Sequence, residues 1–396
     1  MTVYYINLLL ILALAFPLCI YKPNTRKKAA YLLITFSWMW FIATFRYNIG
    51  FDYYNYVDIF DQIRGLSSVW DVRYEPGFVL LTRAMTLFIH DYVVMYGVYQ
   101  ILIMVPVMWF IYRYCKNVWL AVWLYATLTF FYISMNFTRQ ALACSITLLG
   151  YKFLRERKII PYMLIVLLAG SFHFTALIMI PIYFVCNLQL TKRLAIFYGA
   201  ATFALYFTAP LILDLVTRFV FTGYRDSIYV TESLGLRYML VPISILATCL
   251  ILLPAWKKRD SDAVMLTNMM VYSTIIWLFV TRIFIVQRFA VYPEILMLIA
   301  LPAAIGVLLP FDEDYSALKA LQAALPSRDK KKKTAEQKMA DEKIEQLQKS
   351  IKDRNIYYWS AVGAVIIVTL IYHSLGVNMG FHNVFPYQSV LGWGWL

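Results

Sequence analysis

Long apolar runs recur along the whole chain, and they restrict its fold more than any other feature. The first covers Thr2–Tyr21 and the last Ile356–Tyr372, each close to the roughly 20 residues that a helix needs to cross a bilayer. Hydrophobic residues make up 62% of the 396 positions, more apolar surface than a soluble protein of this length could bury. The first run ends in Lys22-Pro23 without a small-residue cleavage site, so we expect a retained helix. The sequence therefore predicts an all-α polytopic membrane protein.

The basic residues between the apolar runs set the expected topology, because short loops rich in lysine and arginine stay in the cytoplasm. Placing these loops inside predicts about 12 transmembrane helices with both termini outside. Counting Gly77–His90 as a span would invert every later loop, so we expect an interfacial or re-entrant helix there. The expected divisions are a membrane domain over residues 1–310 with outer loops 46–75 and 214–236, a charged cytoplasmic loop over residues 311–355, and a last transmembrane helix with an outer tail over residues 356–396.

The charged cytoplasmic loop contains a helix-like stretch, Thr334–Asp353, with a thin apolar stripe. It is either a solvated connector near anionic lipid head groups or a docking helix for a cytoplasmic partner. Most of the net charge of +14 lies in short loops of this kind. The charge therefore sets topology and does not indicate a nucleic-acid-binding protein.

In this topology every basic residue on the outer side is an arginine, whereas every lysine lies inside. A planar guanidinium can bind phosphate through two parallel hydrogen bonds, and it also forms tight pairs with carboxylates. The bias therefore predicts phosphate recognition or Arg–carboxylate pairs on the outer face. The outer arginines are Arg46, Arg64, Arg73, Arg83, Arg139, Arg218, Arg225, Arg237, Arg282 and Arg288.

The stretch from Phe45 to Pro76 places charged residues among aromatic ones, directly after an apolar helix. Glycines within it permit tight turns. We interpret it as a loop that forms a sugar-phosphate site, or else as an ordinary surface loop whose charges pair with one another. Asp52 and Glu75 are its candidate bases or arginine-orienting groups.

His173 lies between two short apolar segments, Ile159–Phe172 and Phe174–Cys186. A 14-residue helix that starts at the cytoplasmic surface climbs about 21 Å of a core roughly 30 Å thick. We therefore expect His173 below the outer surface, at the floor of a depression. Ionisable groups at such depth are usually functional. The alternative is a histidine that bonds a backbone carbonyl at a helix turn.

Three further arginines lie in chemically suggestive positions. Arg139 follows Asn136 at a helix start, where backbone amides favour anions, or it pairs with an outer carboxylate such as Glu75. Arg282 and Arg288 flank the segment before Tyr292 and either bind an anion or anchor the helix at the outer interface.

Several chemistries have no support in the sequence. It contains no Walker loop and no G-x-G-x-x-G motif, and its five cysteines form no C-x-x-C pair. His90, His373 and His382 are isolated, so we expect structural roles for them. We expect chemistry without a metal or a cofactor.

Six short stretches resemble the EpsG family of bacterial exopolysaccharide and O-antigen polymerases, the Wzy-like class. They keep their order over nearly the whole chain, except for the charged loop 311–355. The stretches are R-Y-N-I-G-F-D-Y-Y-N-Y (Arg46–Tyr56), Y-E-P-G-F (Tyr74–Phe78), F-T-R-Q-A-L-A (Phe137–Ala143), A-G-S-F-H-F-T-A-L-I (Ala169–Ile178), Q-R-F-A-V-Y (Gln287–Tyr292) and F-P-Y-Q (Phe385–Gln388).

The resemblance implies a polysaccharide polymerase in the bacterial cytoplasmic (inner) membrane, with its active site facing the periplasm or exterior. Its substrates would be oligosaccharide repeat units on undecaprenyl diphosphate. It would transfer the growing glycan to the non-reducing end of an incoming lipid-linked unit, in an architecture similar to GT-C glycosyltransferases. A flippase and a chain-length regulator would be its partners.

The resemblance also implies roles for particular residues. His173 would be the base or orient the acceptor hydroxyl, with Asp52 or Glu75 as rivals. The expected diphosphate-binding residues are Arg46, Arg139 and Arg288, followed by Arg73 and Arg282. The expected sugar-binding residues are Tyr53, Tyr56, Gln140 and Tyr292.

Three other functions compete with the polymerase. A lipid-linked oligosaccharide flippase should have functional polar groups on both sides of the membrane, whereas the candidates here crowd the outer half. An O-antigen-ligase-type transferase would use the same donor with another acceptor, and the sequence does not separate the two. A membrane O-acyltransferase would need an acyl-CoA path and gives the outer arginines no evident role.

Overall fold

The computed structural model describes residues 2–66, 72–219, 235–324 and 335–392, and their regular structure is helical. An isolated antiparallel bridge between Arg46 and Ser389 is the only extended pairing among these residues. The first half of the chain forms α1 (Thr2–Ala15), η1 (Phe16–Ile20), α2 (Thr25–Thr44), α3 (Tyr53–Arg64), α4 (Pro76–Thr86), α5 (Tyr92–Tyr114), α6 (Val118–Thr127), α7 (Phe130–Asn136), α8 (Thr138–Leu149), α9 (Tyr151–Arg155) and α10 (Ile159–Gly170).

The second half continues with helical segments of very different lengths. These are η2 (Phe174–Ile178), α11 (Met179–Val185), α12 (Lys192–Phe219), η4 (Leu236–Met239), α14 (Leu240–Trp256), α15 (Ala263–Val280), η5 (Phe284–Val286), α16 (Gln287–Glu294), α17 (Met297–Gly306), α18 (Asp312–Ala324), α19 (Ala335–Asn378) and η6 (Phe381–Asn383).

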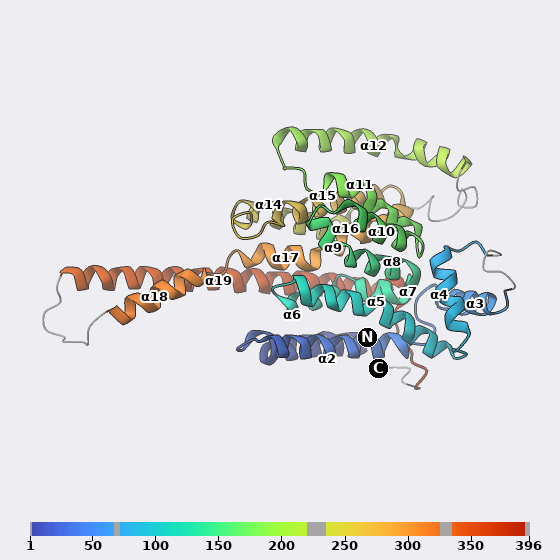
Figure 1. Ribbon diagram of the computed structural model, residues 1–396, viewed down its shortest axis with the longest axis horizontal. Coiled ribbons are helices and arrows are strands. Elements are labelled where there is room, and N and C mark those ends of the chain that lie inside the picture. The colour runs from blue at the N-terminus through green and yellow to red at the C-terminus, as the bar shows by residue number, and fades with distance from the viewer. Residues whose placement is uncertain (1, 67–71, 220–234, 325–334, 393–396) are drawn as a thin grey trace.

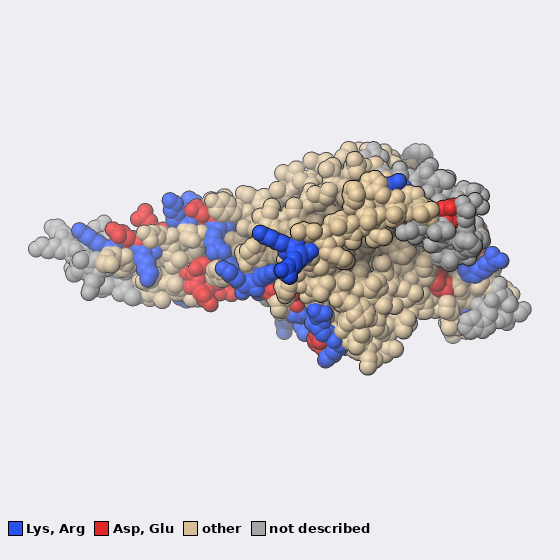
Figure 2. Space-filling view, turned by 90° about the horizontal axis from the view of Figure 1, so that it is seen from above, with Lys and Arg blue, Asp and Glu red and all other residues tan. Residues whose placement is uncertain are grey.

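The apolar helices lie side by side along the long axis of the molecule (Figure 1). Helices α3 and α4 lie at one end, and α18 with the first part of α19 extends beyond the other. All ten residues of α6 are buried, because this helix is apolar on every side and packs against α1, α2, α17 and α19. Charged side chains gather on the extending arm and at its base, while the broad face of the bundle is almost uncharged (Figure 2).

Five helices are long and apolar enough to cross a membrane, or seven if each of two bent pairs is one span. Three shorter apolar helices accompany them among the described residues: α10, α14 and the η2–α11 segment. The chain is therefore a multi-pass membrane protein, as predicted. The larger number of about 12 spans remains a prediction.

Two bends place the ends of helices at the site described below. Helices α6 and α7 meet at 50°, where Thr129 has a φ of +70°. The second pair, η5–α16 and α17, meets at 52°, just after Pro293 in the last turn of α16. Proline cannot donate the backbone hydrogen bond that would continue the helix smoothly.

The outer loop expected at 46–75 contains a helix, α3, which the sequence analysis did not predict. Its buried residues Tyr53, Tyr56, Phe60 and Ile63 recur at helical spacing and face α4 and α5. Helix α4 covers most of the segment expected to be interfacial, Gly77–His90, and begins one residue before it. Most of the other expected outer loop, 214–236, lies outside the residues that the structure describes. Helix α12 continues to Phe219, and residues 220–234 are not described. The side chains of Arg218, Arg225 and Arg237 are not described either.

The expected boundary at residue 355 is not a break in the structure. Helix α19 runs continuously for 44 residues from Ala335 to Asn378, so it joins the helix-like charged stretch to the last apolar run. Beyond it the tail returns to the end of α2, where the backbone nitrogen of Tyr47 donates to the Gln388 carbonyl oxygen at 2.9 Å.

Candidate active site

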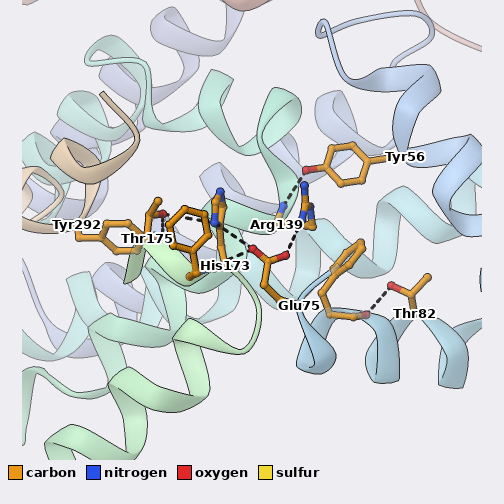
Figure 3. A network of polar contacts seen from close by, with 9 residues as sticks. Tyr56, Glu75, Thr82, Arg139, His173, Thr175 and Tyr292 are labelled. Atoms are coloured by element: carbon orange, nitrogen blue, oxygen red, sulfur yellow. Dashed lines mark hydrogen bonds and ion pairs between the residues drawn. The ribbon is translucent and has the colours of Figure 1, made fainter. Parts of the chain in front are cut away.

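A carboxylate, a guanidinium and an imidazole meet at the end of the bundle that carries α3 and α4 (Figure 3). Glu75 Oε2 accepts a hydrogen bond from Arg139 Nη1 at 2.6 Å. Glu75 Oε1 lies 3.4 Å from His173 Nδ1 and also accepts from the backbone nitrogen of Phe174 at 3.3 Å. Three residues that the sequence singled out are therefore in direct contact, across segments that are far apart in the chain.

Glu75 is held in place because its helix packs directly on the turn before His173. The backbone nitrogens of Gly77 and Phe78 both donate to the carbonyl oxygen of Ser171, at 2.8 and 3.2 Å. A Cβ atom on Gly77 would lie only 2.2 Å from Ser171 Oγ, so glycine is required for this approach. Pro76 occupies the first helical turn, where its missing N–H costs nothing.

Arg139 enters the site from the first turn of α8. Its guanidinium lies 5.0 Å from the ring centre of Tyr74 and 5.7 Å from that of Phe78, within range of cation–π attraction. Its backbone nitrogen donates to Tyr56 Oη at 3.1 Å. The buried Nε atom of Arg139 has no hydrogen-bond partner among the described residues. The pair with Glu75 therefore leaves one buried donor of this guanidinium unused.

Two hydroxyl groups extend the contacts on the far side of His173. Thr175 Oγ1 lies 3.5 Å from His173 Nδ1 and 3.0 Å from Tyr292 Oη. His173 and Tyr292 are both buried. The polar contacts thus run from Tyr56 on α3 to Tyr292 on α16, and we call this group the Glu75 cluster: Tyr56, Glu75, Arg139, His173, Thr175 and Tyr292.

Glu75 and His173 carry different charge states at neutral pH. Burial alone would raise the pKa of Glu75, but the hydrogen bond to His173 and the charge of Arg139 outweigh it and lower that pKa to about 2. Burial lowers the pKa of His173, and so do the positive charges of Arg139 and Arg288. Glu75 raises this pKa, but the three lowering effects together outweigh it. At neutral pH the carboxyl is therefore ionised and the imidazole is neutral, which leaves the imidazole able to accept a proton.

Two hollows lie near the cluster, and residues of the cluster line only one of them. One has a volume of about 350 Å³ and is lined by Asp52, Tyr56, Tyr74 and Arg139 among others. The second is a narrow cavity of about 30 Å³, whose lining includes Arg288 and Gln140. The amide nitrogen of Gln140 donates to the backbone carbonyl of Arg288 at 2.6 Å, which ties α8 to α16.

The sequence model of the EpsG family matches residues 29–319, about three quarters of the chain. The chain belongs to the EpsG family. The whole Glu75 cluster and Arg288 lie inside the matched range, and membership supports a role in polysaccharide biosynthesis. Comparisons with curated proteins and with solved structures gave no match.

Four of the predicted site residues of this EpsG protein lie apart from the cluster. Arg46 is fully buried in the bundle, donates to the carbonyls of Ala43 and Met135, and lies 4.1 Å from the ring centre of Tyr96. Tyr53 is buried beside it and stacks on the same Tyr96 ring.

In the described part of the chain, the remaining two arginines make no hydrogen bond or ion pair with the Glu75 cluster. Arg282 donates to the Tyr206 carbonyl at 3.1 Å and so contacts α12. Arg73 lies close in sequence to Glu75, but its side chain is exposed. The predicted diphosphate-binding set therefore divides into Arg139 and Arg288 at the two hollows, and three arginines elsewhere.

Two residues at the narrow cavity were missed as site candidates. Glu294 lines it and accepts a hydrogen bond from Trp277 Nε1 at 2.9 Å. An acidic residue within the apolar run Val291–Leu309 was the signal that could have found it, because ionisable residues in membrane spans are usually functional. His382, expected to be structural, lines the same cavity from the C-terminal tail and contacts Asn136.

The polar residues described do not form a metal-ligand set. In the parts of the chain that the structure covers, no three His, Cys, Asp or Glu side chains gather closely enough to hold a metal ion. The acid–base groups at the site are instead paired with arginine, hydroxyl and backbone donors.

Proposed function

We propose that this EpsG protein is a lipid-diphosphate-dependent glycosyltransferase of the polymerase type, with a GT-C-like architecture. It would transfer a growing glycan from undecaprenyl diphosphate to the non-reducing end of a lipid-linked repeat unit. Family membership, several apolar spans and a cluster of basic and acid–base groups at one end of the bundle support this proposal.

The observation that carries the proposal is the Glu75 carboxylate, which contacts Arg139 and His173 at once. A carboxyl with a pKa of about 2 is a weak base, so Glu75 suits an orienting role better than a catalytic one. The neutral His173 is the better base. Asp52, the other rival, lies in the polar pocket, where Asn55 donates to its Oδ1 at 3.0 Å.

In the proposed step, His173 takes the proton of the acceptor hydroxyl while the hydroxyl oxygen bonds to the anomeric carbon. The bond from that carbon to the lipid diphosphate breaks, and its electron pair leaves with the diphosphate. A positioned base typically contributes about 10²–10⁴-fold. Arg139, through its unused Nε donor, and Arg288 would stabilise the charge that develops on the leaving group.

The polar pocket beside Arg139 suits the saccharide. Its lining combines hydrogen-bonding groups with the rings of Tyr56 and Tyr74. Aromatic rings with a polar tip pack against the apolar faces of sugars while their hydroxyls bond sugar oxygens. We therefore assign the pocket to the acceptor sugar and the Arg139–Arg288 side to the donor diphosphate.

The proposed orientation places the Glu75 cluster at the periplasmic or exterior face of the bacterial cytoplasmic membrane. Basic side chains at the base of the extending arm would then lie in the cytoplasm, as the positive-inside rule expects. A flippase and a chain-length regulator would act beside the enzyme.

Purified protein in detergent, given lipid-linked repeat units and no membrane gradient, tests the proposal. The polymerase should join two or more units on one lipid. A flippase would form no joined product, and a ligase would transfer glycan only to a different acceptor. Either result would overturn the proposed reaction.

A further inference from the structure

A third and larger cavity lies at the opposite end of the bundle, where α18 and α19 meet the other helices. Its volume is about 470 Å³, within the range of roughly 300–1,000 Å³ that is usual for small-molecule sites. The 23-residue helix α5 runs from the end that carries α3 to this end, a distance of about 34 Å. The residues of the Glu75 cluster do not line this cavity. It is therefore a separate site.

The cavity is lined by basic side chains of two kinds. Arg259 is fixed in its wall, because its Nη2 donates to the Leu309 carbonyl at 3.0 Å and its guanidinium lies 3.6 Å from the ring centre of Phe311. Lys28 and Lys116 also line the cavity, and the ammonium group of neither makes a hydrogen bond or ion pair with any residue that the structure describes. Two ammonium groups are thus available to a ligand.

Two carboxylates share the cavity with these cations. Asp260 accepts a hydrogen bond from the backbone nitrogen of Asp262 at 3.0 Å, so part of its capacity is already used. Asp312 lies in the first turn of α18, where the helix dipole stabilises a negative charge. The three cations still outnumber the two anions, which favours an anionic ligand.

One buried donor at the cavity lacks a partner. Trp256 is 1% exposed, and its Nε1 has no hydrogen-bond acceptor among the described residues. Leaving such a donor unpaired costs about 1–3 kcal/mol, which a ligand oxygen would recover. This donor is independent of the lysines and favours the same kind of ligand.

The rest of the lining is that of an interfacial site. Trp119 and Trp359 contribute indole rings, and Ile20 and Pro302 contribute apolar surface. Tryptophan is enriched where a membrane meets water, and basic pockets between membrane helices bind the head groups of anionic lipids. A soluble anion has no apolar group that could pack against the apolar part of the wall.

We propose that this cavity binds the phosphate-bearing head group of an anionic phospholipid. Lys28 and Lys116 pair with the phosphate oxygens, and Trp256 Nε1 donates to one of them. Asp312 of α18 and Trp359 of α19 line the same cavity, so an occupied site connects the base of the charged arm to the bundle. The inference does not depend on the proposed transferase activity.

Native mass spectrometry of the full chain in detergent tests this site. Phosphatidylglycerol should be retained as one tightly bound copy, and phosphatidylcholine with the same acyl chains should not. The double variant Lys28→Gln/Lys116→Gln should weaken phosphatidylglycerol binding roughly 10- to 30-fold. Trp256→Phe keeps the ring bulk and loses the donor, so it should weaken binding about tenfold.

The matched control is Lys257→Gln/Lys258→Gln, which removes the same charge from exposed positions next to Trp256 that do not line the cavity. It should change binding less than about twofold. Equal retention of the two lipids, or equally weakened binding in the control variant, would show that general surface charge accounts for the binding. Either result would overturn the proposed site. Displacement of the lipid by glycerol phosphate at the same concentration would show a site for a soluble phosphate and would also contradict the proposal.

Discussion

Glu75 lies 64 positions before Arg139 in the sequence, yet its Oε2 accepts a 2.6 Å hydrogen bond from that guanidinium. The other oxygen of the same carboxylate faces His173 at 3.4 Å. One side chain thus fixes both the group proposed to bind the leaving diphosphate and the group proposed to take the proton. The variants below separate these two roles.

Replacing Arg139 by lysine keeps the charge but removes the planar fork of donors. A lysine that pairs with Glu75 has no equivalent of the buried Nε, so we expect polymerisation by Arg139→Lys to fall about 100-fold or more. Initial rates with lipid-linked repeat units measure this. The exposed Arg73→Lys is the control and should keep its rate. An Arg139→Lys enzyme as fast as the wild type would remove Arg139 from the diphosphate site.

The acidic limb of the pH–rate profile should report the protonation of His173. Its pKa is lowered by burial and by Arg139 and Arg288, so the limb should lie below the ordinary histidine value of about 6.5. Removing the negative charge in Glu75→Gln should lower that pKa further and move the limb to lower pH. Removing a positive charge in Arg288→Gln should raise the pKa and move the limb to higher pH.

Rates are measured between pH 4.5 and 8 for the two variants and the wild type. The pH at which each rate falls to half its maximum gives the position of the acidic limb, whatever the maximum rate is. Opposite displacements are the expected result. Displacement of both limbs in one direction, or of neither, would assign the limb to another group.

The ionised Glu75 carboxyl should also stabilise the fold. Its pKa is lowered from 4.5 to about 2, which corresponds to on the order of 3 kcal/mol. Because the folded-state pKa is depressed, this contribution is complete above about pH 4.5 and is lost as the pH falls toward 2. The melting temperature of Glu75→Gln should therefore lie below that of the wild type by a constant amount from pH 7 to 8, where His173 is neutral in both proteins, and the gap should close once Glu75 is protonated. A gap that does not narrow in more acidic buffer would contradict the assigned pKa.

Arg46 should matter for folding more than for chemistry. Its donors satisfy the buried carbonyls of Ala43 and Met135, so Arg46→Ala should destabilise the protein by on the order of 3 kcal/mol. The exposed Arg73→Ala should change stability by less than about 0.5 kcal/mol. Thermal unfolding in detergent compares them. An Arg46→Ala protein that melts normally but does not polymerise would return Arg46 to the diphosphate site.

The helical class and most of the apolar segments could be predicted, because the length of an apolar run is a local property. Helix α3 could not be, since its charged residues obscured the spacing of Tyr53, Tyr56, Phe60 and Ile63. The joining of the charged stretch to the last span in α19 was also missed, because the change in composition near residue 355 suggested a boundary.

The candidate site was predictable in its parts but not in its contacts. Glu75, Arg139 and His173 stood out by residue type and position, and the Arg139–Glu75 pair was one of two stated alternatives. Arg46 and Arg139 were both assigned to the diphosphate, and nothing in the sequence showed that Arg46 would be enclosed. Only packing separates them: Arg46 is enclosed by the bundle, whereas Arg139 lines a pocket.

The most direct test uses cells that lack the enzyme and express Arg139→Ala or His173→Ala at the wild-type level. The account predicts that both variants leave only single repeat units on the lipid carrier, while wild-type protein restores the ladder of long chains. Gel analysis of the lipid-linked and finished glycans measures the outcome. Normal ladders from both variants would contradict the claim that Arg139 and His173 carry the reaction.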